Sequence, residues 1–204
     1  MSEALEASLR SLEAVSKRIG CPLDDASLAT LSRWANLVME WKKAAQLTGL
    51  RSAPAVVQEL MEPALYALSL VQITGDMHIV DFGCGNGCTG VALALAARTG
   101  QWYLVDRDEK KLTFCRHALR ECRISAVKAM SVDTCGRMEV QANVMLMRAM
   151  PRTEQVRSEA RRLLGRDSVV VRWAPEEDVP DVQAAAHCGN SGIWVVATPA
   201  ECFT

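Results

Sequence analysis

The sequence predicts an α/β protein built on a mostly parallel sheet, with a helical extension at its N-terminus and a β-hairpin near its C-terminus. Three observations support this fold class. The first third of the chain carries apolar residues at helical spacing. From about residue 77 short apolar runs alternate with amphipathic segments, as in parallel sheets covered on both faces. Two later apolar runs flank a glycine-bounded turn, which is typical of a hairpin.

The N-terminal third is predicted to be entirely helical. Trp34 and Trp41 recur at seven residues on an apolar helical stripe, so we expect both in the core. Residues 1–73 are expected to form a helical extension packed on a core domain of residues 74–204. The predicted helices cover residues 2–19, a segment that begins at Asp24 or Asp25 as its cap and runs to about Trp41, and residues 54–72.

Five apolar runs after residue 76 are predicted to form strands of one sheet, joined by helices. The strands are expected over residues 77–82, 101–106, 125–130, 143–149 and 167–173, the helices over residues 88–98, 108–122 and 152–165, and the final hairpin over "VQAAAHC" and "IWVVAT", with "GNSG" between them.

The composition is that of an ordinary globular protein. Lysine and arginine number 23 and aspartate and glutamate 24, so the formal charge of −1 gives no global basic field to attract nucleic acid. RNA binding would depend on local patches, and residues 107–123 and 148–166 each concentrate six basic side chains. No apolar run reaches the roughly 18 residues of a membrane span. The charged first ten residues contain no secretory signal, so we expect a cytoplasmic protein without membrane contacts.

The eight cysteines are expected to be reduced and structural. The chain is long, has a full aliphatic core and lacks an export signal, which argues against a disulfide framework. None of the cysteines form C-x-x-C, and Cys84 and Cys88 have no second pair of metal ligands nearby. The sequence therefore predicts no metal site.

The stretch "HIVDFGCGNGCTGVALALAA", residues 78–97, places four glycines within eight residues. Ligands of open α/β sheets bind at the carboxyl ends of the strands, next to the switch in strand order. Gly83, Gly85 and Gly87 let the backbone turn sharply and leave no β-carbons against a ligand. Gly90 lies one turn into the following helix, where a missing side chain permits close packing. The stretch is therefore the predicted ligand site.

Two ligand classes fit the glycine pattern. G-x-G-x-x-G from Gly85 is the dinucleotide fingerprint, whereas D-x-G-x-G-x-G from Asp81 is the pattern of S-adenosylmethionine methyltransferases. Asp106, at the end of the second strand, would accept both hydroxyls of an adenosine ribose in either case. Asp81 distinguishes the classes, because a carboxylate there would repel a pyrophosphate but accept hydrogen bonds around an ammonium and a sulfonium. The sequence favours the methyl donor; a dinucleotide or a loop without ligand stays open.

Four stretches follow the motifs of a known family in order and with similar spacing. They are "LSRWANLVMEWKKAAQLTGL", "IVDFGCGNGCTGVALAL", "LVDRDEKKLTFCR" and "VMLMRAM". They resemble the RsmG family, also called GidB, the guanine-N7 methyltransferases of small-subunit ribosomal RNA. The resemblance implies a class I (Rossmann-like) methyltransferase fold, S-adenosyl-L-methionine as donor, S-adenosyl-L-homocysteine as product, and guanine N7 of 16S ribosomal RNA as acceptor.

The resemblance also implies which residues bind the donor. The family uses its glycine loop, a step after the third strand and the arginine of a motif that reads "MRA" here. The expected partner is small-subunit ribosomal RNA or the ribosomal subunit itself, bound by a monomer, and Arg148 is the candidate catalytic residue. The predicted donor-binding residues are Asp81, Gly83, Gly85, Gly87, Cys88 through its backbone, Asp106, Val132, Asp133 and Arg148.

Arg148 is expected to need an anionic partner. A guanidinium beside a sulfonium is unfavourable unless an anion lies between them. The candidates are the carboxylate of the donor, the side chain of Asp133 and an RNA phosphate.

The chain departs from the family pattern on the acceptor side. "QELMEPALYAL" stands where the family has R-H-x-x-D-S, and "RWAP" replaces a lysine-glycine after the fifth strand. A basic residue before the last strand is also missing. Two alternatives therefore stay open: a methyltransferase for another RNA or a small molecule, and a non-catalytic relative that binds the donor.

Overall fold

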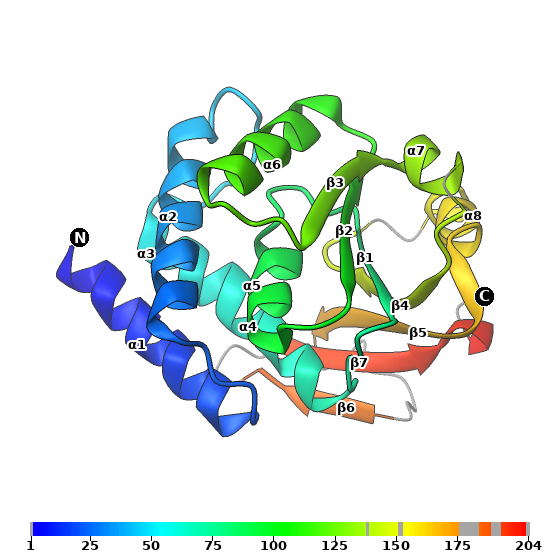
Figure 1. Ribbon diagram of the computed structural model, residues 1–204, viewed down its shortest axis with the longest axis horizontal. Coiled ribbons are helices and arrows are strands. Elements are labelled where there is room, and N and C mark those ends of the chain that lie inside the picture. The colour runs from blue at the N-terminus through cyan, green and yellow to red at the C-terminus, as the bar shows by residue number, and fades with distance from the viewer. Residues whose placement is uncertain (1, 138, 151–152, 176–183, 189–192, 203–204) are drawn as a thin grey trace.

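One central sheet carries helices on both faces (Figure 1). This computed structural model describes residues 2–137, 139–150, 153–175, 184–188 and 193–202. The strands are β1 (His78–Phe82), β2 (Gln101–Asp106), β3 (Val127–Ser131), β4 (Ala142–Met147), β5 (Leu164–Pro175), β6 (Ala184–His187) and β7 (Ile193–Pro199).

The sheet is mostly parallel and ends in a hairpin, as the sequence predicts. The order of the described strands is β3-β2-β1-β4-β5-β7-β6, and β1 to β5 pair in parallel. β7 pairs antiparallel with both β5 and β6, which confirms the C-terminal hairpin; its "GNSG" turn lies outside the described residues. The strand order reverses between β1 and β4, and a ligand of a doubly wound sheet binds at this switch point.

Most of the predicted helices are confirmed. Asp24 is the cap of the second helix, because its Oδ1 accepts a hydrogen bond from the Ser27 amide at 2.8 Å. The helices are α1 (Glu3–Arg18), α2 (Asp25–Trp41), α3 (Ala53–Val56), α4 (Glu62–Leu65), α5 (Cys88–Ala97), α6 (Glu109–Glu121), α7 (Val132–Arg137) and α8 (Glu154–Arg161), with the π-helical turn η1 (Val57–Met61) and the 3-10 turns η2 (Tyr66–Ser69) and η4 (Ala200–Cys202).

Two segments differ from the prediction. The single helix expected over residues 54–72 is interrupted by η1 and ends in η2, because Pro63 has no N–H for a regular helical hydrogen bond. The short helix α7 is not predicted at all. It begins where the Ser131 hydroxyl accepts a hydrogen bond from the Thr134 amide at 3.2 Å, a local contact that no apolar periodicity reveals.

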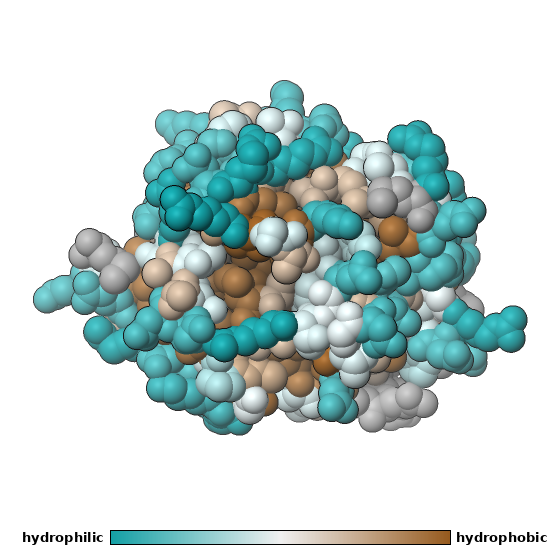
Figure 2. Space-filling view, viewed as in Figure 1, coloured by the Kyte–Doolittle hydropathy of each residue, from teal (hydrophilic) through white to brown (hydrophobic). Residues whose placement is uncertain are grey.

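Both faces of the sheet are buried, as the apolar strands predict. Along β1, Ile79 belongs to a core shared with α5 and the N-terminal helices, whereas Val80 belongs to a second core shared with α7 and α8. Both side chains are fully buried. Figure 2 shows that hydrophilic side chains cover most of the viewed face.

The N-terminal helices are part of the larger core. α2 packs against α5 and α6, and α1 packs against α3 and η1. Trp34 on α2 is fully buried and meets Phe114 edge to face, with ring centroids 5.9 Å apart. Trp41 is half-buried against the same phenylalanine and His117. The prediction that both tryptophans belong to the core is confirmed.

No helix in the described part of the chain is long and apolar enough to cross a membrane. Among the same residues no group of three or more histidine, cysteine or acidic side chains lies where it could hold a metal ion. The structure records free thiols at Cys21, Cys84, Cys88, Cys115, Cys122, Cys135 and Cys188.

Replacement of Leu12 tests whether the N-terminal helices fold as one unit with the sheet. Leu12 on α1 is fully buried in the shared core. We expect Leu12→Ala to lower the free energy of unfolding by about 2–5 kcal/mol in one cooperative transition, measured by urea denaturation. The exposed Arg10→Ala on the same helix is the control, within about 0.5 kcal/mol of wild type. A separate early transition confined to the helices would contradict this expectation.

Candidate functional site

The glycine turn joins the carboxyl end of β1 to the first turn of α5. Gly83, Gly85 and Gly87 have φ values of +73°, +56° and +69°, in the left-handed region that favours glycine. The amides of Gly83 and Cys84 both donate to the carbonyl of Val105 on β2, at 2.8 and 3.0 Å. The turn is therefore tied to the neighbouring strand, and the predicted sharp turn of the backbone is present.

The turn is open on one side and packed on the other. A β-carbon at Gly85 would meet only the Gly83 carbonyl, at 4.0 Å, so the backbone there faces free space. A β-carbon at Gly87 would lie 3.0 Å from the ring of Trp34. The Trp34 Nε1 donates to the carbonyl of Asn86 at 3.0 Å. Helix α2 therefore supports the underside of the turn.

Asp81, at the end of β1, has a protonation state set by burial. Its side chain is 3% exposed, and its Oδ2 accepts a hydrogen bond from the Gly90 amide at 2.9 Å. Burial raises the pKa of Asp81 to about 7, although the Gly90 amide and the positive charge of Arg148 oppose the rise. A β-carbon at Gly90 would lie 2.9 Å from the same carboxylate oxygen. A glycine at position 90 therefore allows the first turn of α5 to lie close to the Asp81 carboxylate.

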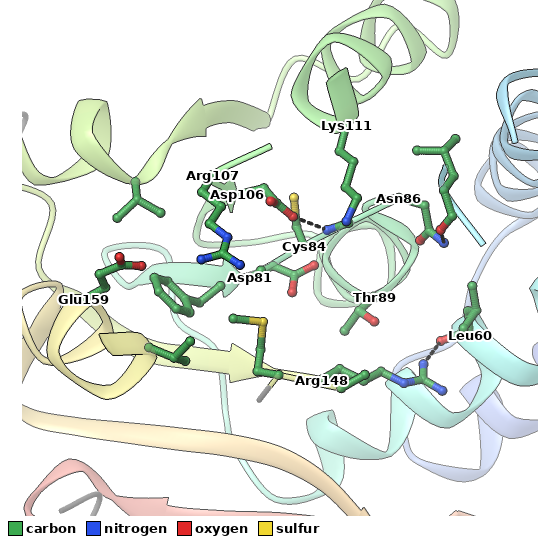
Figure 3. A pocket seen from close by; sticks show the side chains of 18 residues that line it. Leu60, Asp81, Cys84, Asn86, Thr89, Asp106, Arg107, Lys111, Arg148 and Glu159 are labelled. Carbon is green, nitrogen blue, oxygen red and sulfur yellow. Dashed lines mark hydrogen bonds between the residues drawn. The ribbon is translucent and has the colours of Figure 1, made fainter. Parts of the chain in front are cut away.

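Asp106, at the end of β2, is held by two backbone amides. Its Oδ2 accepts from Gly85 at 2.9 Å (Figure 3). Its Oδ1 accepts from Asp108 at the same distance. The side chain is 7% exposed. Each carboxylate oxygen keeps a further lone pair, so Asp106 remains able to accept hydrogen bonds from a ligand.

A cavity of about 380 Å³ lies between these strand ends (Figure 3). Of the predicted residues, Asp81, Gly83, Gly85, Asp106, Val132 and Arg148 line it.

Three predicted residues are not among those that line the cavity. Gly87 packs against Trp34, and Cys88 is buried beneath the turn with 1% of its surface exposed. The Asp133 side chain is exposed on α7. Sequence spacing places these residues near the loop but does not reveal the direction in which each one points.

Several residues that the sequence did not single out also line the cavity. Thr89 lies on α5, Met150 follows β4, and Glu159 lies on α8. Arg107 and Lys111 follow β2 and belong to the basic stretch of residues 107–123. Leu47 and Leu60 complete the apolar part of the wall.

Met150 occupies space that the glycine pattern suggested a ligand would take. A β-carbon at Gly83 would lie 2.0 Å from the Met150 Sδ, so this thioether packs directly on the glycine. Ala149 turns the chain toward the cavity with a φ of +52°, which is uncommon for a residue with a side chain. The bare backbone that faces open space is therefore that of Gly85 rather than that of Gly83.

Arg148 is held by two backbone carbonyls. Its Nη1 donates to the carbonyl of Leu60 at 2.6 Å, and its Nη2 donates to the carbonyl of Glu59. Within the described part of the chain no carboxylate lies within salt-bridge distance of this guanidinium. Asp133, one of the three candidate partners, is therefore not paired with Arg148 here, and the donor carboxylate and an RNA phosphate stay predictions.

The residues of the cavity fit an adenosyl sulfonium compound. Two acidic side chains stand at neighbouring strand ends, and the Gly85 backbone between them faces free space in a cavity of about 380 Å³. The carboxylates suit ribose hydroxyls and positive charge, and they disfavour a pyrophosphate. The fold and this site define a methyltransferase of the Rossmann-like class.

The chain belongs to the GidB family. The model of that family, described as rRNA small subunit methyltransferase G, matches residues 27–181. A ribosomal RNA small subunit methyltransferase G from Wolinella succinogenes is 26% identical over 176 residues, which cover 86% of this chain and 89% of the relative. One from Acinetobacter baylyi is 23% identical over 194 residues, 92% of this chain and 90% of the relative. S-adenosylmethionine is the methyl donor of this family.

Solved structures share the fold. An RNA methyltransferase from Salinibacter ruber, in complex with S-adenosyl-L-homocysteine, superimposes with a TM-score of 0.53 at 15% sequence identity. The match covers 67% of this chain and 89% of that structure.

Replacement of Gly90 tests the contact between α5 and Asp81. The new β-carbon of Gly90→Ala would lie 2.5 Å from the Leu104 Cδ2 and 2.9 Å from the Asp81 Oδ2. We expect a loss of about 1–3 kcal/mol in the free energy of unfolding, measured by urea denaturation. Gly49→Ala is the matched control, since its β-carbon would meet nothing within 4 Å. Equal stability of the two variants would refute the proposed contact.

The pKa of Asp81 predicts a pH-dependent stability. Its pKa is about 7 in the folded chain and ordinarily 3.8, so the folded state holds the proton more tightly. The resulting stabilisation is complete below the ordinary pKa and is lost as the pH rises through 7. Asp81→Asn keeps an acceptor for Gly90 but cannot ionise. Between pH 5 and pH 8, wild type should therefore lose about 1–4 kcal/mol relative to this variant in urea denaturation.

The exposed Asp25→Asn is the control, and its stability should follow the wild-type pH profile. Parallel profiles for wild type and Asp81→Asn would show that Asp81 titrates at its ordinary pKa.

Proposed function

We propose that this chain transfers the methyl group of S-adenosylmethionine to N7 of a guanine in 16S ribosomal RNA. One observation carries the donor assignment: Asp81 and Asp106 line a single cavity, with the open backbone of Gly85 between them. Family membership supports the acceptor. We place the reaction in the cytoplasm, with one chain acting on the small ribosomal subunit or its RNA.

Asp106 and Asp81 are proposed to contact opposite ends of the donor. Asp106 is proposed to accept the ribose hydroxyls, since backbone amides already orient both of its oxygens. Asp81 is proposed to face the positively charged end, which would favour its ionised form and lower its pKa on binding. Val132 and the backbone around Cys88 are proposed to contact the adenosine, and Asp133 stays a candidate from the family motif.

The proposed reaction needs orientation more than acid–base chemistry. When bound, the donor supplies an electrophilic methyl group on a positively charged sulfur. Guanine N7 carries a free lone pair and no proton at neutral pH, so no general base has to act. Holding the reacting atoms in line and excluding water contributes up to roughly 7–11 kcal/mol of such barriers. The cavity wall, with Leu47, Leu60 and Met150, supplies apolar surface for this purpose.

RNA binding is proposed to use the basic residues at the cavity. Arg107 and Lys111 line it from the β2 side. They belong to the basic stretch of residues 107–123, which would contact phosphates. We also propose that residues 1–73 and 74–204 are two parts of one functional unit, because helix α2 supports the glycine turn.

The stretches that depart from the family pattern on the acceptor side favour a second candidate for the methyl acceptor. Pro63 and Trp173 belong to the stretches that replace the family's R-H-x-x-D-S and lysine-glycine elements, and both lie near Arg148. A different RNA acceptor would be consistent with this change. Methyl transfer to small subunits that lack the modification separates the two candidates.

Asp106→Ala tests the proposed donor site. We expect binding of S-adenosyl-L-homocysteine, measured by calorimetry, to weaken about 10–100-fold, since charge-assisted hydrogen bonds contribute about 1.5–3 kcal/mol. Labelled methyl transfer to small ribosomal subunits from a strain without the modification should fall in parallel. Asp25→Ala, exposed on α2, is the control. Absence of binding by the wild-type chain at millimolar ligand would refute the donor assignment.

A further inference from the structure

A proline leaves one carbonyl of the N-terminal segment without a regular helical partner. In an α-helix the Glu59 carbonyl would accept from residue 63, but Pro63 has no N–H. The chain forms the π-helical turn η1 just before this proline. Such turns arise where the α-helical hydrogen-bond ladder is interrupted and are frequent at functional sites. Without a bond from residue 63, this carbonyl can accept from another element, as it does from Arg148.

Arg148 supplies this donor from the end of β4. Its two terminal nitrogens donate to the carbonyls of Glu59 and Leu60, 89 and 88 residues away in the sequence. The planar fork of a guanidinium suits two adjacent carbonyl oxygens. In Figure 3 the Arg148 side chain runs along the cavity toward Leu60. The Arg148 side chain therefore connects the π-helical turn to the wall of the cavity.

Trp173 completes the surroundings of Arg148. The guanidinium carbon lies 5.9 Å from the centre of the Trp173 ring, within the range of a cation–π contact. The Trp173 Nε1 donates to the Pro63 carbonyl at 2.9 Å. Trp173 thus connects β5 to the segment that carries Arg148's acceptors. We define Glu59, Leu60, Pro63 and Trp173 as the Arg148 cradle.

The cradle itself offers Arg148 no ion pair. Its partners are neutral carbonyls and an aromatic ring, and among the described residues no carboxylate forms an ion pair with it. A guanidinium has five N–H donors, of which the cradle uses two. A positive charge held at the wall of a cavity attracts an anion. The donor proposed above carries one, the carboxylate of its methionine end.

We infer that Pro63 and Trp173 are positioning residues that hold the Arg148 guanidinium at the cavity wall, where its remaining N–H groups bind the carboxylate of the methyl donor. This inference rests on the proposed function for the identity of the donor. The residues that replace the family's acceptor-side elements thereby acquire a role on the donor side.

Two ligands separate positioning from a general loss of structure. S-adenosyl-L-homocysteine contains the amino-acid carboxylate, and 5′-methylthioadenosine contains the same adenosine without it. With calorimetry, we expect Trp173→Leu and Pro63→Ala to weaken the first ligand at least fivefold and to change the second by less than twofold. Pro63→Ala restores an N–H that competes for the Glu59 carbonyl. Trp173→Phe keeps a ring beneath Arg148 and should have a smaller effect than Trp173→Leu.

Each variant has a matched control. Trp102→Phe removes an equivalent bond, because the Trp102 Nε1 donates to the Thr99 carbonyl at 2.8 Å before the start of β2. Pro54→Ala removes a proline from the first turn of α3, where no regular helical bond is lost. Neither control should alter binding of either ligand by more than twofold.

The outcomes distinguish the inference from the proposed function. If the wild-type chain binds neither ligand, the donor assignment fails and the inference fails with it. If wild type binds both and the cradle variants weaken both equally, the cradle has only a structural role and the inference is wrong. Unchanged binding of S-adenosyl-L-homocysteine in folded Trp173→Leu and Pro63→Ala variants would also overturn it. Thermal unfolding of each variant identifies any that does not fold.

Discussion

Two buried carboxylates fix the turn on which the rest of the site depends. Asp106 accepts from the Gly85 amide inside the turn, and Asp81 accepts from the Gly90 amide in the first turn of α5. Carboxylates are costly to bury unless such donors reach them. The same hydrogen bonds therefore make the buried acids tolerable and hold the backbone in its shape. A cavity with acidic groups at two neighbouring strand ends is the result.

The helices before the sheet belong to this site as much as the strands do. Trp34 supports the turn through the Asn86 carbonyl, and the carbonyls of Glu59 and Leu60 hold Arg148. The first third of the chain also shares one apolar core with the sheet. An isolated sheet with its own helices would lack both the support beneath the glycine turn and one wall of the cavity.

Most of the fold follows from the sequence, because strands buried on both faces are apolar throughout. β2 begins and ends at the predicted residues, and the predicted hairpin forms. Residue type and strand end predict that Asp81 and Asp106 lie together, and both line one cavity. The sequence does not reveal the direction of a side chain: the Asp133 side chain is exposed and Arg148 turns toward Leu60. Met150 was missed because an apolar residue after a strand carries no signal of its contact with Gly83.

The position of β7 has a consequence for how the sheet is completed. β7 is the last of the described strands in chain order, yet it lies between β5 and β6. Until residues 193–199 have been synthesised, β5 keeps one row of backbone donors and acceptors unpaired, and β6 has no described strand to join. Free edges of this kind invite pairing with other chains. The nascent protein therefore remains open to misassembly along β5 until its final strand is inserted, however early the glycine turn has formed.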